Sequence, residues 1–442
     1  MSTVVGPDPV PILSALIRFD TTNPPGAERA CVQYVAGLLA GAGIDSRLVA
    51  LDPERPNLVA RVDGDGLAPA LVLQAHADVV PTTGQIWSHP PLCGDVIDGH
   101  VFGRGSIDMK GGLAMMLAAL LRLRAEGRRP AGDVILTVVA DEEAGSVYGA
   151  HHLVHEHPDL FTGARYCVGE DGGAGLTLGG LRIHPIVVAE KRAGWLRATM
   201  RGSGGHGSRR RPDTAVGQLA TLLSTLYGRR LPTHITPAAD RMLQELAKAL
   251  PEPFSGQLDA LRQGGDTDVG PLLAGLPADD AVYLDSVTRH TANPTIVRTS
   301  EKINMIPSEV TVDIDGRILP GGFTLEDFLS EVRELAGPRV DLELLLEGEP
   351  MPDPTFGPFY DLLVDLVHEL DPHALALPMV TPASTDARLF AQLGMACYGW
   401  LPMRLPAGSR YHELLHAADE RIPVESVRFG AGSLYELLRR YR

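Results

Sequence analysis

The sequence has few cysteines, and nothing in their spacing ties them together. Only four occur in 442 residues, and no CxxC pair is present. Single, scattered cysteines are typical of reduced thiols in a cytoplasmic protein, where most serve as small core residues. Residues 1–11 also lack a basic stretch followed by an apolar one, so we predict no signal peptide and a cytoplasmic location. The four thiols are Cys31, Cys93, Cys167 and Cys397.

Long apolar runs and positive charge are both scarce. No apolar stretch reaches the length of a membrane span, so we expect no membrane partner. The formal net charge of −16 argues against the clustered basic face that nucleic-acid binding requires. One short basic run, SRRRP at residues 208–212, is interpreted as a solvated loop. The hydrophobic content of 44% and the charged content of 21% are those of an ordinary soluble globular protein.

Phosphate-binding motifs are missing as well. The glycine-rich run GRGSIDMKGG at residues 103–112 does not match the GxxxxGK[ST] pattern of a phosphate loop. No dinucleotide fingerprint follows a predicted strand, and no internal repeat or low-complexity tract stands out. A nucleotide-binding α/β protein is therefore a weak alternative.

The length exceeds the usual size of a single core, so we expect two domains. Residues 1–190 alternate helical and strand patterns, which predicts a βαβ-type arrangement and the first part of an α/β catalytic domain. Sheets of this kind gather ligands beyond the carboxyl ends of their strands. The predicted strands are at 70–75, 133–140 and 166–169, and the predicted helices are at 10–18, 27–41 and 110–126.

After Glu190 the pattern changes. With one further strand that the pattern does not place, the elements would follow the β-α-β-β-α-β order of a ferredoxin-like unit. We predict a second domain over residues 191–350, with an insertion near 232–293, and a return to the catalytic domain over 351–442. The predicted strands are at 195–201, 309–319 and 340–346, and the predicted helices are at 212–228 and 325–336.

Three short runs carry the candidate chemistry. His76 and Asp78 follow a predicted strand, where His76 can present one ring nitrogen to a metal while Asp78 accepts the proton of the other. On its own, a His-x-Asp tripeptide is more typical of a surface or of a satisfied core. Asp108 begins the helix at residue 110 among glycines that allow close backbone approach. An N-cap aspartate is the simpler interpretation, and it is compatible with a ligand role.

The third run, Asp141-Glu142-Glu143, follows a buried strand. A solvated turn is the simpler interpretation. In a metal site, one glutamate can bind the metal while the other takes a proton from a metal-bound water. The three runs together supply a nitrogen ligand, a bridging acid, a further acid and a spare base, which is what a carboxylate-bridged pair of divalent metals needs. Near the C-terminus, His416 and His412 compete as a further ligand, and spacing does not decide between them.

Six motifs in order resemble the M20 family of zinc metallopeptidases. That family includes aminoacylases, acetylornithine and succinyl-diaminopimelate deacylases, glutamate carboxypeptidase and dipeptidases. The resemblance extends over nearly the whole chain, and GRGSIDMKGG is its most specific part. It implies a mixed-sheet, zinc-exopeptidase-like α/β domain with an inserted ferredoxin-like α+β lid and dimerisation domain. The motifs are HADVVP, GRGSIDMKGG, DEEAGS, GEDGG, GGHGS and HAADER.

The resemblance implies a role for each motif residue. His76 and Glu170 would bind one zinc, Glu143 and His416 would bind the other, and Asp108 would bridge them. Glu142 would be the general acid and base, Asp78 would orient His76, and the Asp108–Met109 peptide would be cis.

At two positions of this ligand set, a nearby residue competes with the ligand. At the fourth ligand position, the family commonly has Glu followed by Gly or Pro. In this sequence Glu170 is followed by Asp171, so Asp171 is the alternative ligand at that position. His416 is preferred to His412 because Glu-Arg follows it, as in the family motif. Four carboxylates would balance two Zn²⁺ ions, and Co²⁺ or Mn²⁺ are alternative metals.

The resemblance also implies functional residues in the second domain. His206, in GGHGS, would reach the active site of a partner subunit and stabilise the oxyanion, so we expect a homodimer. Asn304 and Arg317 would contact the substrate, and Arg317 suits bidentate capture of a free carboxylate. A flexible glycine loop and an ordinary strand arginine are the simpler interpretations of these sites.

We therefore expect a dinuclear zinc hydrolase that cleaves an amide bond of a small dipeptide-like substrate with a free carboxylate. The first alternative is a deacylase for N-acyl amino acids of the acetylornithine or succinyl-diaminopimelate type. The second, from another class, is an inactive metal-binding scaffold protein. The intact Glu142 argues against the scaffold. The length of the 232–293 insertion and the GEDGG variant favour the peptidase.

Overall fold

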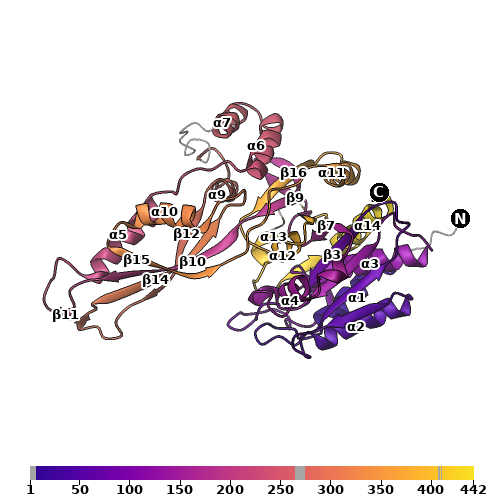
Figure 1. Ribbon diagram of the computed structural model, residues 1–442, viewed down its shortest axis with the longest axis horizontal. Coiled ribbons are helices and arrows are strands. Elements are labelled where there is room, and N and C mark those ends of the chain that lie inside the picture. The colour runs from indigo at the N-terminus through magenta and orange to yellow at the C-terminus, as the bar shows by residue number, and fades with distance from the viewer. Residues whose placement is uncertain (1–5, 264–273, 407–408, 410) are drawn as a thin grey trace. The chain divides into compact units, whose positions relative to one another are not determined.

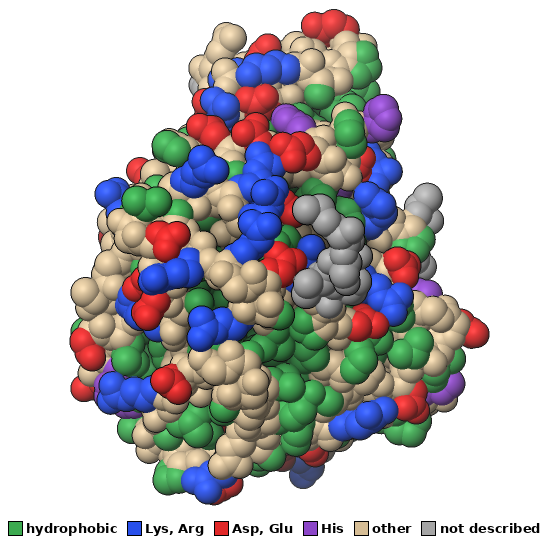
Figure 2. All heavy atoms as spheres, turned by 90° about the vertical axis from the view of Figure 1, so that its right-hand side faces the viewer, with side chains coloured by type: hydrophobic (Ala, Val, Ile, Leu, Met, Phe, Trp, Pro, Cys, Tyr) green, Lys and Arg blue, Asp and Glu red, His purple; other side chains and the backbone are tan. Residues whose placement is uncertain are grey.

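The computed structural model describes residues 6–263, 274–406, 409 and 411–442. It divides into two compact units, which are drawn in Figure 1 and described separately below. Unit 1 comprises residues 1–188, 354–379 and 385–442, and unit 2 comprises residues 189–353 and 380–384. No helix among the described residues is long and apolar enough to cross a bilayer. On the face drawn in Figure 2, acidic side chains lie among basic ones.

A mixed sheet forms the centre of unit 1, so the predicted mixed α/β fold is confirmed. Within the described residues it has nine strands in the order β1-β2-β6-β3-β7-β17-β9-β16, with β8 paired to β9. The bounds are β1 Ser46–Val49, β2 Asn57–Val62, β3 Ala70–His76, β6 Val134–Val139, β7 Ala164–Gly169, β8 Leu176–Leu178, β9 Leu181–Glu190, β16 Leu375–Thr381 and β17 Ala396–Gly399. A small second sheet contains β4 Val96–Ile97, β5 His100–Phe102 and β18 Arg421–Pro423.

The centre of this sheet is apolar on both faces. Strand β3 pairs in parallel with β6 on one side and with β7 on the other. Every residue of β3 and β6 is buried, which explains why both sequences read as continuous apolar runs. Because the three strands are parallel, their carboxyl ends lie at the same edge of the sheet. The residues that follow them are therefore brought together there.

Helices cover the sheet of unit 1. Every residue of helix α3 from Lys110 to Leu120 is buried, and the helix packs against α1 and α14 (Figure 1). The α-helices are α1 Pro9–Ile17, α2 Arg29–Gly41, α3 Lys110–Ala125, α4 Ala150–Glu156, α11 Pro358–Leu370, α12 Ala387–Ala391, α13 Tyr411–Leu414 and α14 Val424–Arg440. Two 3-10 helices, η1 Glu142–Ala144 and η2 Pro158–Phe161, follow β6 and α4.

Unit 2 has an antiparallel sheet in the order β12-β14-β10-β15. One face packs on α5 and α10 through a core that includes Leu196, Val312 and Phe328. The strands are β10 Arg192–Arg201, β12 Thr291–Arg298, β14 Glu309–Ile318 and β15 Val340–Glu347, with β11 Gly205–His206 and β13 Met305–Ile306 forming a separate pair. The helices are α5 Ala215–Gly228, α6 Pro237–Ala249, α7 Phe254–Arg262, α9 Ala278–Val287 and α10 Leu325–Ala336.

The strand that the sequence pattern did not place is β12. Its first residues, 291–293, overlap the end of the range near 232–293 that the sequence assigns to an insertion. Pro294 interrupts the apolar alternation of this segment. A proline is tolerated here because β12 is an edge strand, where one side of the backbone needs no partner. The resulting order β10-α5-β12-β14-α10-β15 is that of a ferredoxin-like unit.

Candidate metal centre

The carboxyl ends of three neighbouring strands carry the candidate ligands of unit 1. His76 is the last residue of β3, Glu170 directly follows β7, and Glu142 and Glu143 lie in η1 after β6. Since β3 lies between β6 and β7, these side chains converge on the end of the central strand. Two further residues, Asp108 before α3 and His416 after α13, come from loops.

One group consists of His76, Asp108 and Glu170. His76 Nε2 lies 3.0 Å from Asp108 Oδ1 and 3.3 Å from Glu170 Oε2. Each residue offers a ligand atom within 4.8 Å of the others. On the far side of the ring, His76 Nδ1 lies 3.0 Å from the main-chain oxygen of Asp78. Because a carbonyl oxygen only accepts, Nδ1 carries a proton and Nε2 is the nitrogen that remains for a metal.

A second group consists of Asp108, Glu143 and His416, again with ligand atoms within 4.8 Å of one another. His416 Nε2 lies 3.0 Å from Asp108 Oδ2 and 3.4 Å from Glu143 Oε2. Asp108 thus directs one carboxylate oxygen to each histidine. A carboxylate with one oxygen on each side is the arrangement that a bridging ligand needs.

The loop before α3 brings Asp108 to this position. A Cβ atom on Gly111 would lie 2.2 Å from the carbonyl oxygen of Ser106, so the first turn of the helix requires glycine to lie against that loop. The Asp108–Met109 peptide is cis, as the family resemblance implies. The N-cap residue of α3 is Met109. Asp108 therefore lies one residue before the N-cap position that the simpler interpretation assigns to it.

The crowded acids shift each other's pKa values. Burial raises the pKa of Glu170 to about 7. Burial and the negative charge of Glu170 hold the pKa of Glu142 well above its usual range. The hydrogen bond to Asp108, supported by Glu143, raises the pKa of His416 to about 10. Burial lowers the pKa of His76, but Glu170 and Asp108 outweigh it and raise that pKa. The site therefore favours bound positive charge.

The two competing residues of the sequence lie outside both groups. Among the described residues, His412 and Asp171 belong to neither ligand group. Asp171 adopts a left-handed conformation with φ 62°, and its carboxylate accepts the N–H of Gly172. The geometry thus favours Glu170 over Asp171 and His416 over His412.

Asp78 has a second set of contacts that the sequence did not reveal. Its carboxylate accepts the backbone N–H groups of Glu142 and Glu143, at 3.2 and 3.1 Å, and the side chain of Asn23 at 2.8 Å. The Asp78 Oδ1 atom lies 3.5 Å from His76 Nδ1, whereas the main-chain oxygen of Asp78 lies 3.0 Å from the same nitrogen. Asp78 therefore holds the turn that carries the two glutamates as well as the ring of His76.

A buried ion-pair network supports this turn. Asn23 also donates to Asp141, which begins η1 in a left-handed conformation. Arg55 donates to Asp141 at 3.0 Å and to Glu28 at 2.7 Å, and all three ionic side chains are at most 6% exposed. No sequence pattern indicates this network, since isolated charged residues are usually solvated.

The candidate residues of unit 2 lie on two different parts of its structure. His206 and Asn304 belong to the β11–β13 region, where Gly207 N–H donates to the carbonyl oxygen of Asn304. The exposed His206 ring bonds to Ser208 at 2.8 Å. Arg317, near the end of β14, forms a two-point ion pair with Asp315.

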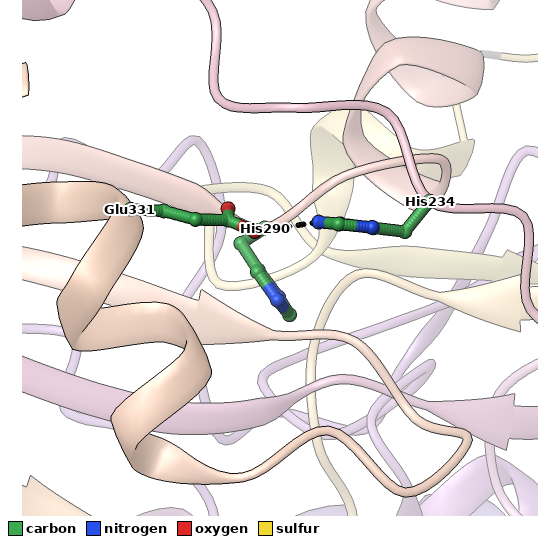
Figure 3. Close-up of side chains that lie close together, drawn as sticks. All are labelled: His234, His290 and Glu331. Carbon is green, nitrogen blue, oxygen red and sulfur yellow. Dashed lines mark hydrogen bonds and ion pairs between the residues drawn. The ribbon is translucent and has the colours of Figure 1, made fainter. Parts of the chain in front are cut away.

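Unit 2 also holds a third histidine and glutamate group, shown in Figure 3: His234, His290 and Glu331. His234 Nε2 bonds to Glu331 at 2.6 Å. His290 Nδ1 accepts the N–H of Leu319, so the neutral ring carries its proton on Nε2. Burial lowers the pKa of His290 to about 3, which keeps the ring neutral. Neither nitrogen of His290 then has a free lone pair, so we interpret the group as a structural cluster rather than a metal centre. His290 Nε2 has no hydrogen-bond partner among the described residues.

Comparison with known proteins identifies the family of the chain. The family model described as Peptidase family M20/M25/M40 matches residues 72–440. The chain therefore belongs to this family and is a hydrolytic enzyme of the M20 peptidase and aminoacylase type.

Relatives of both types are found. Aminoacylase-1 of Sus scrofa is 26% identical over 427 residues, covering 93% of this chain and 90% of that protein. An M20 family metallo-carboxypeptidase of Sulfolobus solfataricus superposes with a TM-score of 0.70 at 18% identity, over 98% of this chain and 99% of that one. A Bacillus subtilis protein described as a dinuclear metal-binding M20 peptidase gives 0.58 at 12% identity, over 97% and 96%. At these identities the two solved structures support the fold alone.

Replacing Arg55 tests the network behind the site. We expect Arg55→Met to lower the free energy of unfolding by about 3–5 kcal/mol, because Glu28 and Asp141 would stay buried without their cation. The matched control is Arg29→Met, whose partner Glu54 is 3.4 Å away and whose side chains are 43% and 67% exposed. That variant should change stability by about 0–1 kcal/mol. Urea unfolding measures both, and equal losses would contradict the supporting role of Arg55.

Proposed function

We propose that the protein is a dinuclear zinc hydrolase that cleaves the amide bond of a small dipeptide-like substrate with a free carboxylate. The observation that carries this proposal is the position of Asp108, whose two carboxylate oxygens each lie 3.0 Å from a different histidine. This is the geometry expected of a carboxylate that bridges two metals.

The residues fit two zinc ions. His76 and Glu170 with Asp108 would hold one, and Glu143 and His416 with Asp108 would hold the other. Imidazole nitrogen and carboxylate oxygen are both common zinc ligands. Glu143 Oε1 and Glu170 Oε1 are buried without a hydrogen-bond partner among the described residues, which is costly unless a cation is bound. Co²⁺ or Mn²⁺ would suit the same oxygen and nitrogen donors.

Charge balance supports two metals over one. Asp108, Glu142, Glu143 and Glu170, when ionised, carry four negative charges, and two divalent ions would neutralise them. A single ion would leave excess negative charge at a buried site. Without a metal, this burial of negative charge raises the pKa values of Glu170 and Glu142.

Glu142 is the proposed general base and acid. Bound zinc would polarise the scissile carbonyl and lower the pKa of water. Glu142 belongs to neither ligand group, although it is next to Glu143, so its carboxylate is free to take a proton from the attacking water. It would then pass this proton to the leaving amine. Burial raises the pKa of Glu142, which strengthens the affinity of its carboxylate for the proton that it takes from water.

Arg317 and Asn304 are the proposed substrate contacts. The guanidinium of Arg317 suits a free carboxylate. Because Arg317 is already paired with Asp315 at 2.8 Å, a substrate carboxylate would use its remaining N–H group or displace Asp315.

The second candidate is a deacylase for N-acyl amino acids, of the acetylornithine or succinyl-diaminopimelate type. The similarity to aminoacylase-1 over 93% of the chain favours this candidate. Both reactions break an amide bond next to a carboxylate, so the same metal site serves either. An inactive scaffold is disfavoured because both ligand groups and Glu142 are intact.

A substrate panel separates the two candidates. We expect free dipeptides to give higher kcat/KM than N-acetyl or N-succinyl amino acids carrying the same C-terminal residue, measured with the zinc-loaded protein. Because the C-terminal residue is the same in each pair, the contact with the carboxylate stays constant. The difference in kcat/KM then reports the preference on the acyl side of the amide bond. A reversed order would establish the deacylase and reject the peptidase.

Glu142→Gln tests the base. We expect kcat to fall by about 10²–10⁴-fold, because the amide does not accept a proton from water. Zinc stoichiometry should stay unchanged, since Glu142 is in neither ligand group. Glu156→Gln, at an exposed position of α4, is the control for loss of one carboxylate. Equal turnover of wild type and Glu142→Gln would support the scaffold instead.

We also propose that the enzyme is a homodimer in which His206 acts in the active site of the partner. The His206 side chain is exposed, so it is accessible to a second copy. We expect His206→Ala to lower kcat by about 10²–10³-fold through loss of one oxyanion donor. Mixing this variant with Glu142→Gln should restore activity, because each mixed dimer then has one complete site. If mixing restores nothing while subunits exchange, His206 does not act across a dimer.

A further inference from the structure

Glu420 is a buried acid in HAADER to which the proposed mechanism gives no role. It is fully buried and lies four residues after His416. Its Oε1 accepts the backbone N–H groups of Ile107 and Asp108, at 2.8 and 3.2 Å, and its Oε2 accepts that of Gly105 at 3.1 Å. One carboxylate thus fixes the backbone of the loop that ends at Asp108.

Arg104 and Gln85 extend these contacts back to His416. Arg104, 1% exposed, donates to Glu420 at 2.6 Å and to the side-chain oxygen of Gln85 at 2.8 Å. Its guanidinium also lies over the ring of Trp87, 5.2 Å from the centroid. The amide group of Gln85 donates to the main-chain oxygen of His416 at 2.7 Å. We call Glu420, Arg104 and Gln85 the Glu420 network.

We propose that the Glu420 network is a positioning device that sets the separation between Asp108 and His416. This inference rests on the proposed function, in which both residues bind the same metal. The network begins at the backbone of Asp108 and ends at the backbone of His416, so it joins the two ligands by a path that does not pass through their side chains.

The two ligands need such a connection. They are 308 residues apart in sequence, and neither lies within a helix or strand. His416 has φ 59°, a conformation that an L-residue adopts only when its surroundings hold it. A metal site tolerates displacements of only about 0.5 Å. Charge-assisted hydrogen bonds of Arg104 and Glu420, shielded from water, supply the required rigidity.

Two variants with matched controls test the network. Gln85→Met keeps the size of a half-buried side chain but removes its three side-chain hydrogen bonds, to His416, Arg104 and Trp87. Gln33→Met, at an exposed position of α2, is its control. Glu420→Gln removes the charge, and Glu425→Gln, whose side chain is 82% exposed, is its control. Zn²⁺ binding to metal-free protein is measured by competition with a chromophoric chelator, and urea unfolding is followed on the same samples.

We expect Gln85→Met and Glu420→Gln to weaken the binding of at least one Zn²⁺ by about 10–100-fold, as is typical when a partner of a metal ligand is removed. For Gln85→Met, unfolding of the metal-free protein should match its control. A purely structural role would change unfolding and leave the affinity for Zn²⁺ unaltered. If Glu420→Gln does not fold, Gln85→Met decides the question.

Wild-type Zn²⁺ affinity in Gln85→Met would overturn the inference. The proposed function fails differently, because then the wild type itself would not bind two Zn²⁺ ions. The stoichiometry of the wild type therefore separates the two failures.

Discussion

The structure of unit 1 depends on keeping four carboxylates and two imidazoles within contact distance. Like charges at such separations repel, and burial removes the water that would screen them. The loops that carry these residues are held by two further buried acids, Asp78 and Glu420. Backbone N–H groups of Glu142 and Glu143 bond to Asp78, and those of Gly105, Ile107 and Asp108 bond to Glu420. These donors belong to the same loops that carry the ligands, so each loop is fixed by the acids around it.

Two buried arginines complete this arrangement. Arg55 lies between Glu28 and Asp141 behind the turn that carries Glu142, and Arg104 pairs with Glu420 behind Asp108. Each places a permanent positive charge near the cluster without contacting the candidate ligands. These contacts would hold the loops in one conformation whether or not a metal ion is bound. Such preorganisation lowers the cost of ordering the ligands when metal binds.

The sequence predicted the ligands better than their supports. His76, Glu142, Glu143 and Glu170 follow apolar strands, and parallel strands bring their carboxyl ends to one edge, so local patterns sufficed for this grouping. Asp108 stood out as an acid among glycines at a predicted helix start, whereas the choice of His416 over His412 required the family motif. Arg55 and Glu420 were missed because their partners are remote in sequence, with Arg55 86 residues from Asp141 and Glu420 316 residues from Arg104. Strand β12 was missed because Pro294 breaks its alternation.

The same donor types need not make a metal site, as two of the buried histidines show. His76 directs Nδ1 to a carbonyl oxygen, so its proton is fixed there and Nε2 faces Asp108 and Glu170. In His290, Nδ1 accepts the N–H of Leu319, so the proton is on Nε2. Replacing the hydrogen-bond acceptor behind the ring with a donor moves the proton to the other ring nitrogen. The nitrogen that faces outward can then no longer bind a cation. Both groups combine histidine with carboxylate, but only the one in unit 1 has the tautomer that a metal needs. The backbone group behind each ring therefore distinguishes a candidate metal centre from a structural cluster, and that group cannot be read from the side chains alone.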